Sequence, residues 1–364
     1  KPTLFLGLPA GLALVLAGSP ALMSAGQATP NESVTFTKDI APILQRSCQS
    51  CHHPGSVAPT SLLTYEEVRP WAKSIKLRTG LRDKPETMPP WFVERNIGIQ
   101  QFKDNVALSE TEIAKIATWV DAGAPRGNPA DMPPPLTFAD ETKWALGKPD
   151  LLLTSPPITV AALAPDWWGP VGEVPTGLTE DRYVASVEMR EVSDAQGKKA
   201  ERQTVGASFI VHHLVFTAVG ADGKPDLSPD GLPWPVHEVG RNADIFDPDA
   251  GRLLKAGSKL LLTSAHLHAN GRPTKAQIEF GFKLHPKGYQ PTKTFRRLTG
   301  AWRDLDIKGN DANQRFEAFS VLPENAKMVV FEPHLHAAGV RMCLDAIYGT
   351  EVETLNCVGY NHGW

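Results

Sequence analysis

Apolar residues recur at helical spacing in two stretches of the N-terminal third of the chain. In VTFTKDIAPILQRSC, residues 34–48, apolar side chains such as Ile40 and Leu44 fall on one helical face. In LSETEIAKIATWVDAGAP, residues 108–125, a serine and a glutamate three positions apart form a capping box, and glycine and proline follow the apolar run. The pattern predicts a small all-α unit over residues 34–126 that begins and ends with a helix.

From about residue 150 the pattern changes to short runs in which apolar and polar residues alternate. Alternation with period two, broken by turn residues, predicts half-buried strands. The predicted strands cover residues 182–192, 208–219, 259–268, 275–284, 327–336, 341–348 and 352–358. The expected fold is therefore multidomain, with the small all-α unit followed by an all-β antiparallel sandwich region. We expect a proline-rich linker at 127–150, one complete sandwich at 151–290 and a partial one at 291–364.

The segment 1–33 carries a long uncharged apolar run, TLFLGLPAGLALVLAG, after Lys1 and before small polar residues. This pattern is typical of an export signal peptide or a membrane anchor, and we favour a retained anchor. Either interpretation places the rest of the chain on the periplasmic side of a bacterial inner membrane. In that compartment thiols oxidise and heme can be attached.

Charge and composition narrow the classes of partner. The 364 residues carry a formal net charge of -3, and 21% of them are charged. Without a basic excess there is no face that would attract a nucleic-acid backbone, so we expect no nucleic-acid partner. The 32 prolines and 30 glycines favour turn-rich β structure outside the N-terminal third.

The first predicted helix ends in RSCQSCHHPG, which places Cys48 and Cys51 three positions apart and His52 directly after them. A redox dithiol would usually open a helix that follows a strand, and no strand is predicted here. Structural zinc needs a second ligand pair, which the helical unit lacks. Covalent heme c needs two thioethers on adjacent helical turns and a histidine facing the iron, and C-x-x-C-H supplies all three. We therefore expect heme c on both cysteines, with His52 as proximal ligand.

Downstream, TMPPW offers Met88 in a proline-stiffened loop. A thioether on the far side of the heme would raise its potential toward that of an electron-transfer cytochrome, whereas a lone methionine more often fills a core. The helix, the C-x-x-C-H motif, the M-P-P loop and the closing helix together resemble a class I cytochrome c domain over residues 34–126. The resemblance implies Met88 as the second iron ligand and electron transfer as the role.

Six histidines of the predicted β region occur in three pairs: His212-His213, His266-x-His268 and His334-x-His336. On a strand, H-x-H turns both rings to one face, whereas adjacent histidines point oppositely unless a bulge or a chain end realigns them. Imidazole-rich sites without thiolates suit copper or zinc. One such histidine alone would more often be a hydrogen-bonded surface or core residue, but three pairs on separate strands predict a metal site.

The segments IVHHLVF, LLLTSAHLHANG and VVFEPHLHAAG follow in the order seen in copper type II, ascorbate-dependent monooxygenases, typified by peptidylglycine alpha-hydroxylating monooxygenase. From about residue 151 the chain resembles this family, which has two small β-sandwich domains with one copper each. The resemblance implies an electron-transfer copper with three imidazole ligands, His212, His213 and His266. It also implies that His334 and His336 bind a second, oxygen-binding copper, at which a C–H bond is attacked.

Two features depart from this family. Its second copper is completed by a methionine farther beyond the H-x-H pair than this sequence extends, and Met342 is a poor substitute because a strand would carry it away. We therefore expect the second sandwich to be truncated, or to be completed by strands from a partner. His268 adds an imidazole for which the family has no role, so it is either an alternative ligand or solvated.

The two remaining cysteines lie in the last two predicted strands. RMCLDAIY and VETLNCV are typical of a hairpin turning at Gly349-Thr350. Cys343 and Cys357 are equidistant from residue 350, so they are cross-strand neighbours if the hairpin is symmetric. In an oxidising compartment we expect a disulfide between them, and two buried reduced thiols are the alternative.

Together these features predict an exported, membrane-anchored heme c electron-transfer protein joined to a copper monooxygenase-like β region, with the heme replacing ascorbate as donor. A second hypothesis is an accessory or docking subunit of a membrane-bound respiratory or photosynthetic electron-transfer complex, and a third is an electron carrier that stores copper. The expected partner is a redox protein or such a membrane complex. The substrate is not identified: Trp167, Trp168 and Trp234 could line a pocket, although core packing is the more common role.

Overall fold

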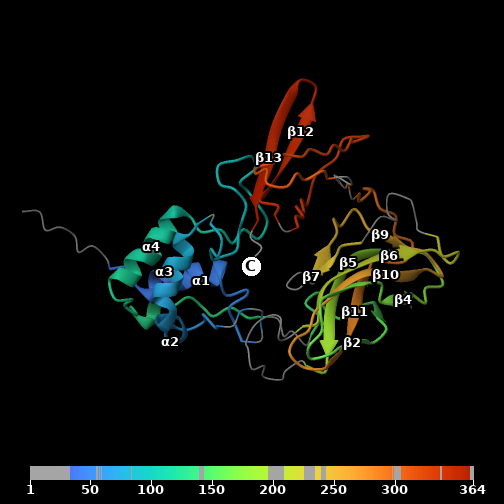
Figure 1. Cartoon of the computed structure of the whole chain (residues 1–364). Helices are drawn as coiled ribbons and strands as arrows, with labels where there is room; N and C mark the ends of the chain where they lie inside the picture. The colour runs from blue at the N-terminus through green and yellow to red at the C-terminus, as the bar shows by residue number, and fades with distance from the viewer. Residues whose placement is uncertain are drawn as a thin grey trace, which may run out of the picture. The chain divides into compact units, whose positions relative to one another are not determined.

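The computed structural model describes residues 33–360 except 55, 57, 59, 83, 139–142, 196–208, 225–233, 239–242, 297, 299–304 and 337. The described part is mostly β, built from antiparallel sheets, with a few short helices in its N-terminal third (Figure 1). The apolar segment for which the sequence predicts a signal or an anchor lies outside the described residues except for Ser33. Within the described ranges, no helix combines the length and the hydrophobicity needed to cross a membrane.

Short helices pack around one apolar cluster in the N-terminal third. The helical segments are η1, a π-helix at Phe36–Ile40, α1 (Ala41–Ser47), α2 (Tyr65–Val68), η2 (Arg69–Trp71), α3 (Ala72–Gly80), α4 (Glu110–Asp121) and η3 (Pro129–Asp131). Phe36 and Trp119 lie at the centre of the cluster and are 1% and 0% exposed. The carbonyl of Pro125 accepts hydrogen bonds from the Phe36 amide and from the Trp119 indole, both at 3.0 Å. These bonds join the beginning of the helical region to its end.

Helix α4 forms where its sequence pattern predicts it. The Ser109 hydroxyl accepts from the Glu112 amide, and the Glu112 carboxylate accepts from the Ser109 amide, so the capping box is confirmed. Its buried face carries Ile113, Ile116 and Trp119. The helices α2 and α3 were not predicted, because α3 has only a weak apolar stripe, with Ala72 and Thr79 as its buried residues.

The β region contains two larger antiparallel sheets. The six-stranded sheet has the order β1 (Leu151–Thr154), β11 (Thr274–Leu284), β5 (Arg182–Ser193), β8 (Ala243–Ile245), with β2 (Ile158–Val160) on β11 and β9 (Arg252–Leu254) on β5. The five-stranded sheet has the order β3 (Trp167–Gly169), β10 (Lys259–Leu267), β6 (Val211–Val219), β7 (His237–Glu238), with β4 (Gly172–Pro175) on β10. The predicted strands at 182–192, 208–219, 259–268 and 275–284 correspond to β5, β6, β10 and β11.

Side chains from both sheets meet in one core. The rings of Phe216 on β6 and Phe280 on β11 lie 5.1 Å apart, and Trp234 packs on Phe216 and Phe282 at 5.8 and 5.7 Å. All four of these aromatic residues are fully buried, so the core-packing role expected for Trp234 is confirmed. Alternation along β6 and β10 turns one face of the sheet into this core and leaves the other face for polar chemistry.

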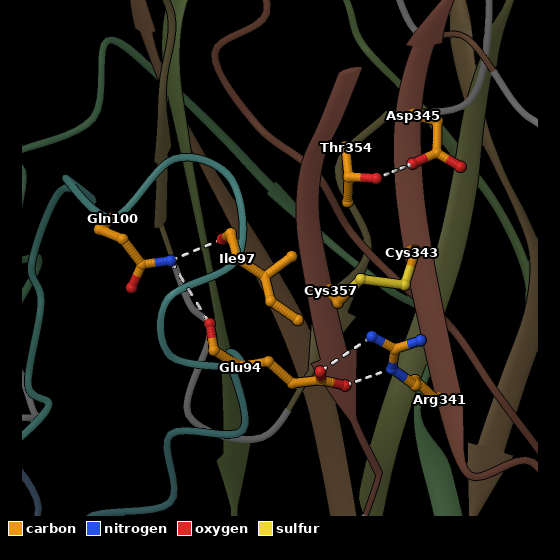
Figure 2. The surroundings of a disulfide bond; sticks show 8 residues. All are labelled: Glu94, Ile97, Gln100, Arg341, Cys343, Asp345, Thr354 and Cys357. Atoms are coloured by element: carbon orange, nitrogen blue, oxygen red, sulfur yellow. Dashed lines mark hydrogen bonds and ion pairs between the residues drawn. A yellow bond between two sulfur atoms is a disulfide. The ribbon is translucent and has the colours of Figure 1, made fainter. Parts of the chain in front are cut away.

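The last two strands, β12 (Arg341–Tyr348) and β13 (Glu351–Gly359), form the predicted hairpin. Cys343 pairs with Cys357, and a disulfide joins them (Figure 2). Near the turn the strands pair with Tyr348 opposite Glu351, but Leu355 is an extra residue that shifts the register before the cysteines meet. The bulge therefore brings the two thiols opposite each other.

A segment that follows Met88 in the chain pairs with this hairpin. The amide of Glu94 donates to the Cys357 carbonyl at 2.8 Å, and the amide of Gly359 donates to the Phe92 carbonyl at 2.9 Å. The Glu94 carboxylate also binds the Arg341 guanidinium through both oxygens beside the disulfide (Figure 2). Val93 thus forms an isolated antiparallel bridge with Val358 at the edge of the hairpin.

The strand predicted at residues 327–336 is not formed. This segment has no strand pairing, and most of its side chains are exposed. An isolated extended segment gains no ladder hydrogen bonds, so its alternating pattern is not sufficient to make a strand. In the described part of residues 291–364, β12 and β13 are the strands that form.

Residues 144–149, at the end of the segment predicted as a linker, are held against the six-stranded sheet. The buried Glu188 carboxylate accepts hydrogen bonds from the amides of Ala145 and Leu146, both at 2.9 Å, and the Arg190 guanidinium lies 4.2 Å from the ring centre of Trp144. Trp144 lies directly over Gly281, where an added Cβ would meet its ring carbon at 2.6 Å. Gly281 is therefore the residue that lets Trp144 approach the sheet.

We predict that Gly281→Ala destabilises the β region by about 1–3 kcal/mol, because Trp144 and Pro149 must move away from the new methyl group. Urea unfolding of the variant and the wild type measures this. The matched control is Gly309→Ala, where an added Cβ meets nothing within 4 Å. Equal unfolding midpoints for Gly281→Ala and the wild type would contradict the packing argument.

Candidate metal and heme sites

Three histidines converge on the face of the five-stranded sheet that points away from the core. His266 on β10 pairs with His213 on β6, and the next residue of β10, Leu267, pairs with Val211. His212 is therefore an extra residue in β6, a β-bulge. The bulge turns two successive side chains, His212 and His213, outward between the buried Val211 and Leu214. The bulge that the sequence requires to bring two adjacent histidines to one face of a strand is therefore present.

The three imidazoles are close enough to share one ion. One ligand nitrogen from each of His212, His213 and His266 lies within 4.8 Å of the others, and the Nδ1 atoms of His212 and His213 are 3.4 Å apart. The ring centres are separated by 4.8 to 5.6 Å. Among the described residues, no other set of three or more His, Cys, Asp or Glu side chains brings its ligand atoms this close together.

Burial and mutual repulsion keep two of these rings neutral. Desolvation, followed by the neighbouring His266 and His268, lowers the pKa of His212. Desolvation is also the main reason why the pKa of His213 falls to about 4, with smaller contributions from four other histidines. At neutral pH these rings therefore carry lone pairs that a metal ion can use.

His266 is held on two sides by a segment that sequence analysis did not connect with it. Its Nε2 lies 3.1 Å from a carboxylate oxygen of Asp166. The ring of Trp168 stacks on it with centres 4.3 Å apart and an angle of 14°. Trp167 and Trp168 are 44% and 58% exposed, so the core-packing role expected for these two tryptophans is wrong.

The start of β6 is fixed by a buried carboxylate. Glu191 accepts hydrogen bonds from the amides of Ile210 and Val211, with a shortest distance of 2.8 Å. The His268 amide donates to the Ile210 carbonyl at 3.0 Å, and the His268 ring centre lies 6.3 Å from that of His212. Glu191 thus holds the backbone directly before the two adjacent histidines, and His268 lies at the edge of the cluster.

The third histidine pair is less enclosed. His334 and His336 have ring centres 4.9 Å apart, and both side chains are exposed on a segment without regular structure. Both rings contribute to lowering the pKa of His213, which places them in the electrostatic neighbourhood of the three-histidine cluster. In the described part of the chain, no third His, Cys, Asp or Glu joins this pair within the distance that defines the cluster.

The cysteine pair lies where α1 ends. Cys48 caps α1, and its carbonyl accepts from the amides of Cys51 and His52 at 3.1 and 2.9 Å, so the C-x-x-C-H motif continues the helical turn. Burial raises the pKa of the Cys48 thiol to about 12. A reactive redox dithiol needs the opposite shift, and the C-terminal end of a helix does not favour a thiolate.

His52 and Met88 border the same helical region. His52 Nδ1 lies 2.9 Å from the Thr60 carbonyl, which can only accept, so Nδ1 donates and the neutral ring has its lone pair on Nε2. The Met88 amide donates to the Arg78 carbonyl at 3.2 Å, and its side chain lines a small cavity beside Leu108. Leu108 belongs to the apolar cluster against which Cys48 also packs.

No protein-family model matches the chain, and no curated protein matches it. The function is therefore argued from the residues themselves. Sequence analysis identified the cysteines, the methionine and the histidines, but it missed Asp166, Glu191 and Thr60. Each of these contacts its site from a distant part of the chain or from an irregular loop, and no motif marks it.

Glu191 predicts a pH dependence of stability in the metal-free protein. Burial raises the pKa of its carboxyl from 4.5 to about 7. Between these values the native state binds more protons than the unfolded state, so the free energy of unfolding falls as pH rises through this window. The loss is on the order of 3 kcal/mol. Urea unfolding between pH 4.5 and 8 measures it, and Glu191→Gln should flatten the profile. An unchanged slope in the variant would contradict this assignment.

Proposed function

We propose that this chain is an exported heme c electron-transfer protein joined to a copper monooxygenase-like β region. In this proposal the helical region is a cytochrome c-like domain and the two larger sheets form a copper-binding sandwich. The observation that carries the proposal is the convergence of His212, His213 and His266, because a bulge opposite β10 turns two adjacent imidazoles toward a third. The bulge lies at the end of the β6–β10 ladder, between its last two pairs, where it places both imidazoles beside His266.

The donor set fits copper. His212, His213 and His266 supply imidazole nitrogens without a thiolate or a carboxylate, a combination suited to copper or zinc. Copper held there would exchange one electron at a time. The sheet beneath the cluster contributes rigidity, because Val211 and Leu214 on either side of the two adjacent histidines are fully buried in the core. Fixed ligands need little rearrangement between two oxidation states, which favours electron transfer.

The helical region fits covalent heme c. Cys48 and Cys51 follow a helix end in the spacing that two thioether bonds need, and the hydrogen bond to Thr60 leaves His52 Nε2 available for iron. The raised pKa of Cys48 argues against the redox-dithiol alternative. Met88 is the proposed second iron ligand, because its loop is tied to the end of α3 and its side chain lines a cavity beside Leu108, a member of the apolar cluster against which Cys48 packs.

His334 and His336 are the proposed ligands of a second copper, at which a substrate C–H bond would be oxidised. Their support is the H-x-H spacing, the 4.9 Å between their ring centres, and their electrostatic influence on His213. A reduced heme would supply electrons that reach this pair through the three-histidine cluster. A periplasmic redox protein or a membrane electron-transfer complex would in turn reduce the heme, with the N-terminal segment as membrane attachment.

We predict that the purified full chain contains one covalent heme and binds copper at the three-histidine cluster. His266→Ala should remove one copper equivalent per chain, because two imidazoles remain. Metal analysis counts copper, zinc and iron, and the pyridine hemochrome spectrum identifies the thioether-linked heme. His285→Ala is the control, since this ring binds the Ala250 carbonyl and lies outside the cluster. The same copper content in His266→Ala and the wild type would reject the proposed site.

The heme assignment has a matched pair of variants in adjacent residues. His52→Ala should lose the native heme spectrum or the heme itself, whereas His53→Ala should keep both, because His53 stacks on Phe138 instead. Stopped-flow spectra then test electron transfer from heme to copper. After rapid reduction, the heme of the copper-loaded protein should be reoxidised by oxygen in a fast phase. His212→Ala should remove this fast phase. Heme that stays reduced in the wild type would favour the alternative role, an accessory subunit of a membrane electron-transfer complex.

A further inference from the structure

Two residues of one short segment at the edge of the five-stranded sheet contact the imidazole of His266. Asp166 directly precedes β3, the edge strand that pairs with β10, and Trp168 lies opposite His266 in that pairing. Asp166 touches the rim of the imidazole and Trp168 covers its face. The side chain of His266 is only 14% exposed in this arrangement, whereas that of Asp166 is 52% exposed.

We infer that Asp166 is a positioning residue for the copper site, which holds His266 in the tautomer with the proton on Nε2 and directs Nδ1 at the metal. A carboxylate can only accept a hydrogen bond, so Nε2 at 3.1 Å must carry the hydrogen. In the neutral ring Nδ1 then keeps the lone pair. This inference rests on the proposed function, because it assigns a role within the proposed three-imidazole site.

The other two ligands point to the same choice of atom. The Nδ1 atoms of His212 and His213 lie 3.4 Å apart, close enough for one ion to bind both. With Nε2 of His266 bound to Asp166, all three rings can offer the same nitrogen. Asp166 is not part of the group of mutually close ligand atoms, which separates its role from that of a ligand.

Trp168 restricts the rotation that Asp166 alone would allow. The hydrogen bond fixes one edge of the imidazole, but the ring could still turn about it. The stacked indole, parallel to within 14°, removes this freedom on one side. Asp166 and Trp168 belong to one short stretch of chain, so a single piece of backbone sets both contacts.

The charge of Asp166 should also influence the metal. A carboxylate bound to the far nitrogen makes a ligand imidazole more electron-rich, and loss of such a partner typically weakens metal binding 10- to 100-fold. The extra negative charge stabilises Cu(II) more than Cu(I). Removal of the charge should therefore weaken Cu(II) binding and raise the reduction potential of the site.

The first test uses the metal-free full chain and does not depend on copper. Long-range 1H–15N NMR distinguishes the two neutral tautomers of each histidine, with His266→Ala used to assign the signal. We expect His266 as the Nε2–H tautomer in the wild type and a mixture of tautomers in Asp166→Ala. A wild-type His266 protonated on Nδ1 would overturn the inference, whether or not the protein binds copper.

The second test compares Cu(II) binding by Asp166→Asn, Trp168→Leu and the wild type, with chelator competition, the EPR spectrum of Cu(II) and the reduction potential as readouts. Asp166→Asn should bind Cu(II) 10- to 100-fold more weakly with a changed spectrum and a higher potential. Asp222→Asn is the control, because this aspartate accepts a hydrogen bond from the nearby Lys224 amide in a turn and is not among the candidate metal ligands. Urea unfolding of each variant separates these effects from general destabilisation.

The outcomes distinguish the two proposals. If the wild type binds no copper at the three histidines, the proposed function fails and this role of Asp166 fails with it. If the wild type binds copper and Asp166→Asn has the same affinity, spectrum and potential, the inference alone is wrong. A weaker, spectrally changed site in Asp166→Asn, with Asp222→Asn unchanged, supports it.

Discussion

One extra residue in strand β6 is the constraint on which the candidate metal centre depends. In an uninterrupted ladder His212 and His213 would face opposite sides of the sheet, and only one of them could meet His266. Because His212 has no partner between the pairs His213–His266 and Val211–Leu267, both rings turn outward together. The bulge is tolerated because the core is restored at once on either side, by Val211 and Leu214.

The surroundings of this bulge hold it in place through contacts from other strands. Glu191 on β5 binds the amides of Ile210 and Val211, which come directly before the histidine pair. On the other side, β10 carries His266, and Asp166 and Trp168 restrain its ring. The sheet therefore supplies rigid backbone, and residues outside the motif supply orientation. This division resembles that of metal sites in general, where partners behind the ligands determine how the ligands point.

The C-terminal hairpin connects two segments that carry proposed ligands. Segment 92–94, which follows Met88 closely in the chain, hydrogen-bonds to β13, and Glu94 binds Arg341, which follows His336 closely (Figure 2). Gly98 allows Ile99 to approach the bulged Leu355, because an added Cβ would lie 2.2 Å from the Leu355 carbonyl oxygen. An extended segment can add to the edge of a sheet through its backbone amides and carbonyls, and the loop after Met88 adds to the edge of β13 in this way.

Local sequence patterns were sufficient to locate the helix and strands that are determined by their own residues. The capping box set the start of α4, period-two alternation located β5, β6, β10 and β11, and the turn residues at 349 and 350 located the last hairpin. The residue types alone also indicated the candidate side chains, of which the structure brings His212, His213 and His266 together. The same alternation failed at residues 327–336, because a strand exists only where another chain segment pairs with it.

What only the tertiary structure decided is how the chemical groups are placed. The sequence shows two adjacent histidines, but the register between β6 and β10 determines that His212 is the bulged residue. It shows an aspartate and two tryptophans far upstream, but only the pairing of β3 with β10 brings Asp166 and Trp168 to His266. Periodicity records which face of a strand is buried. Register and contacts between distant segments depend on how two surfaces pack, and no single segment contains that information.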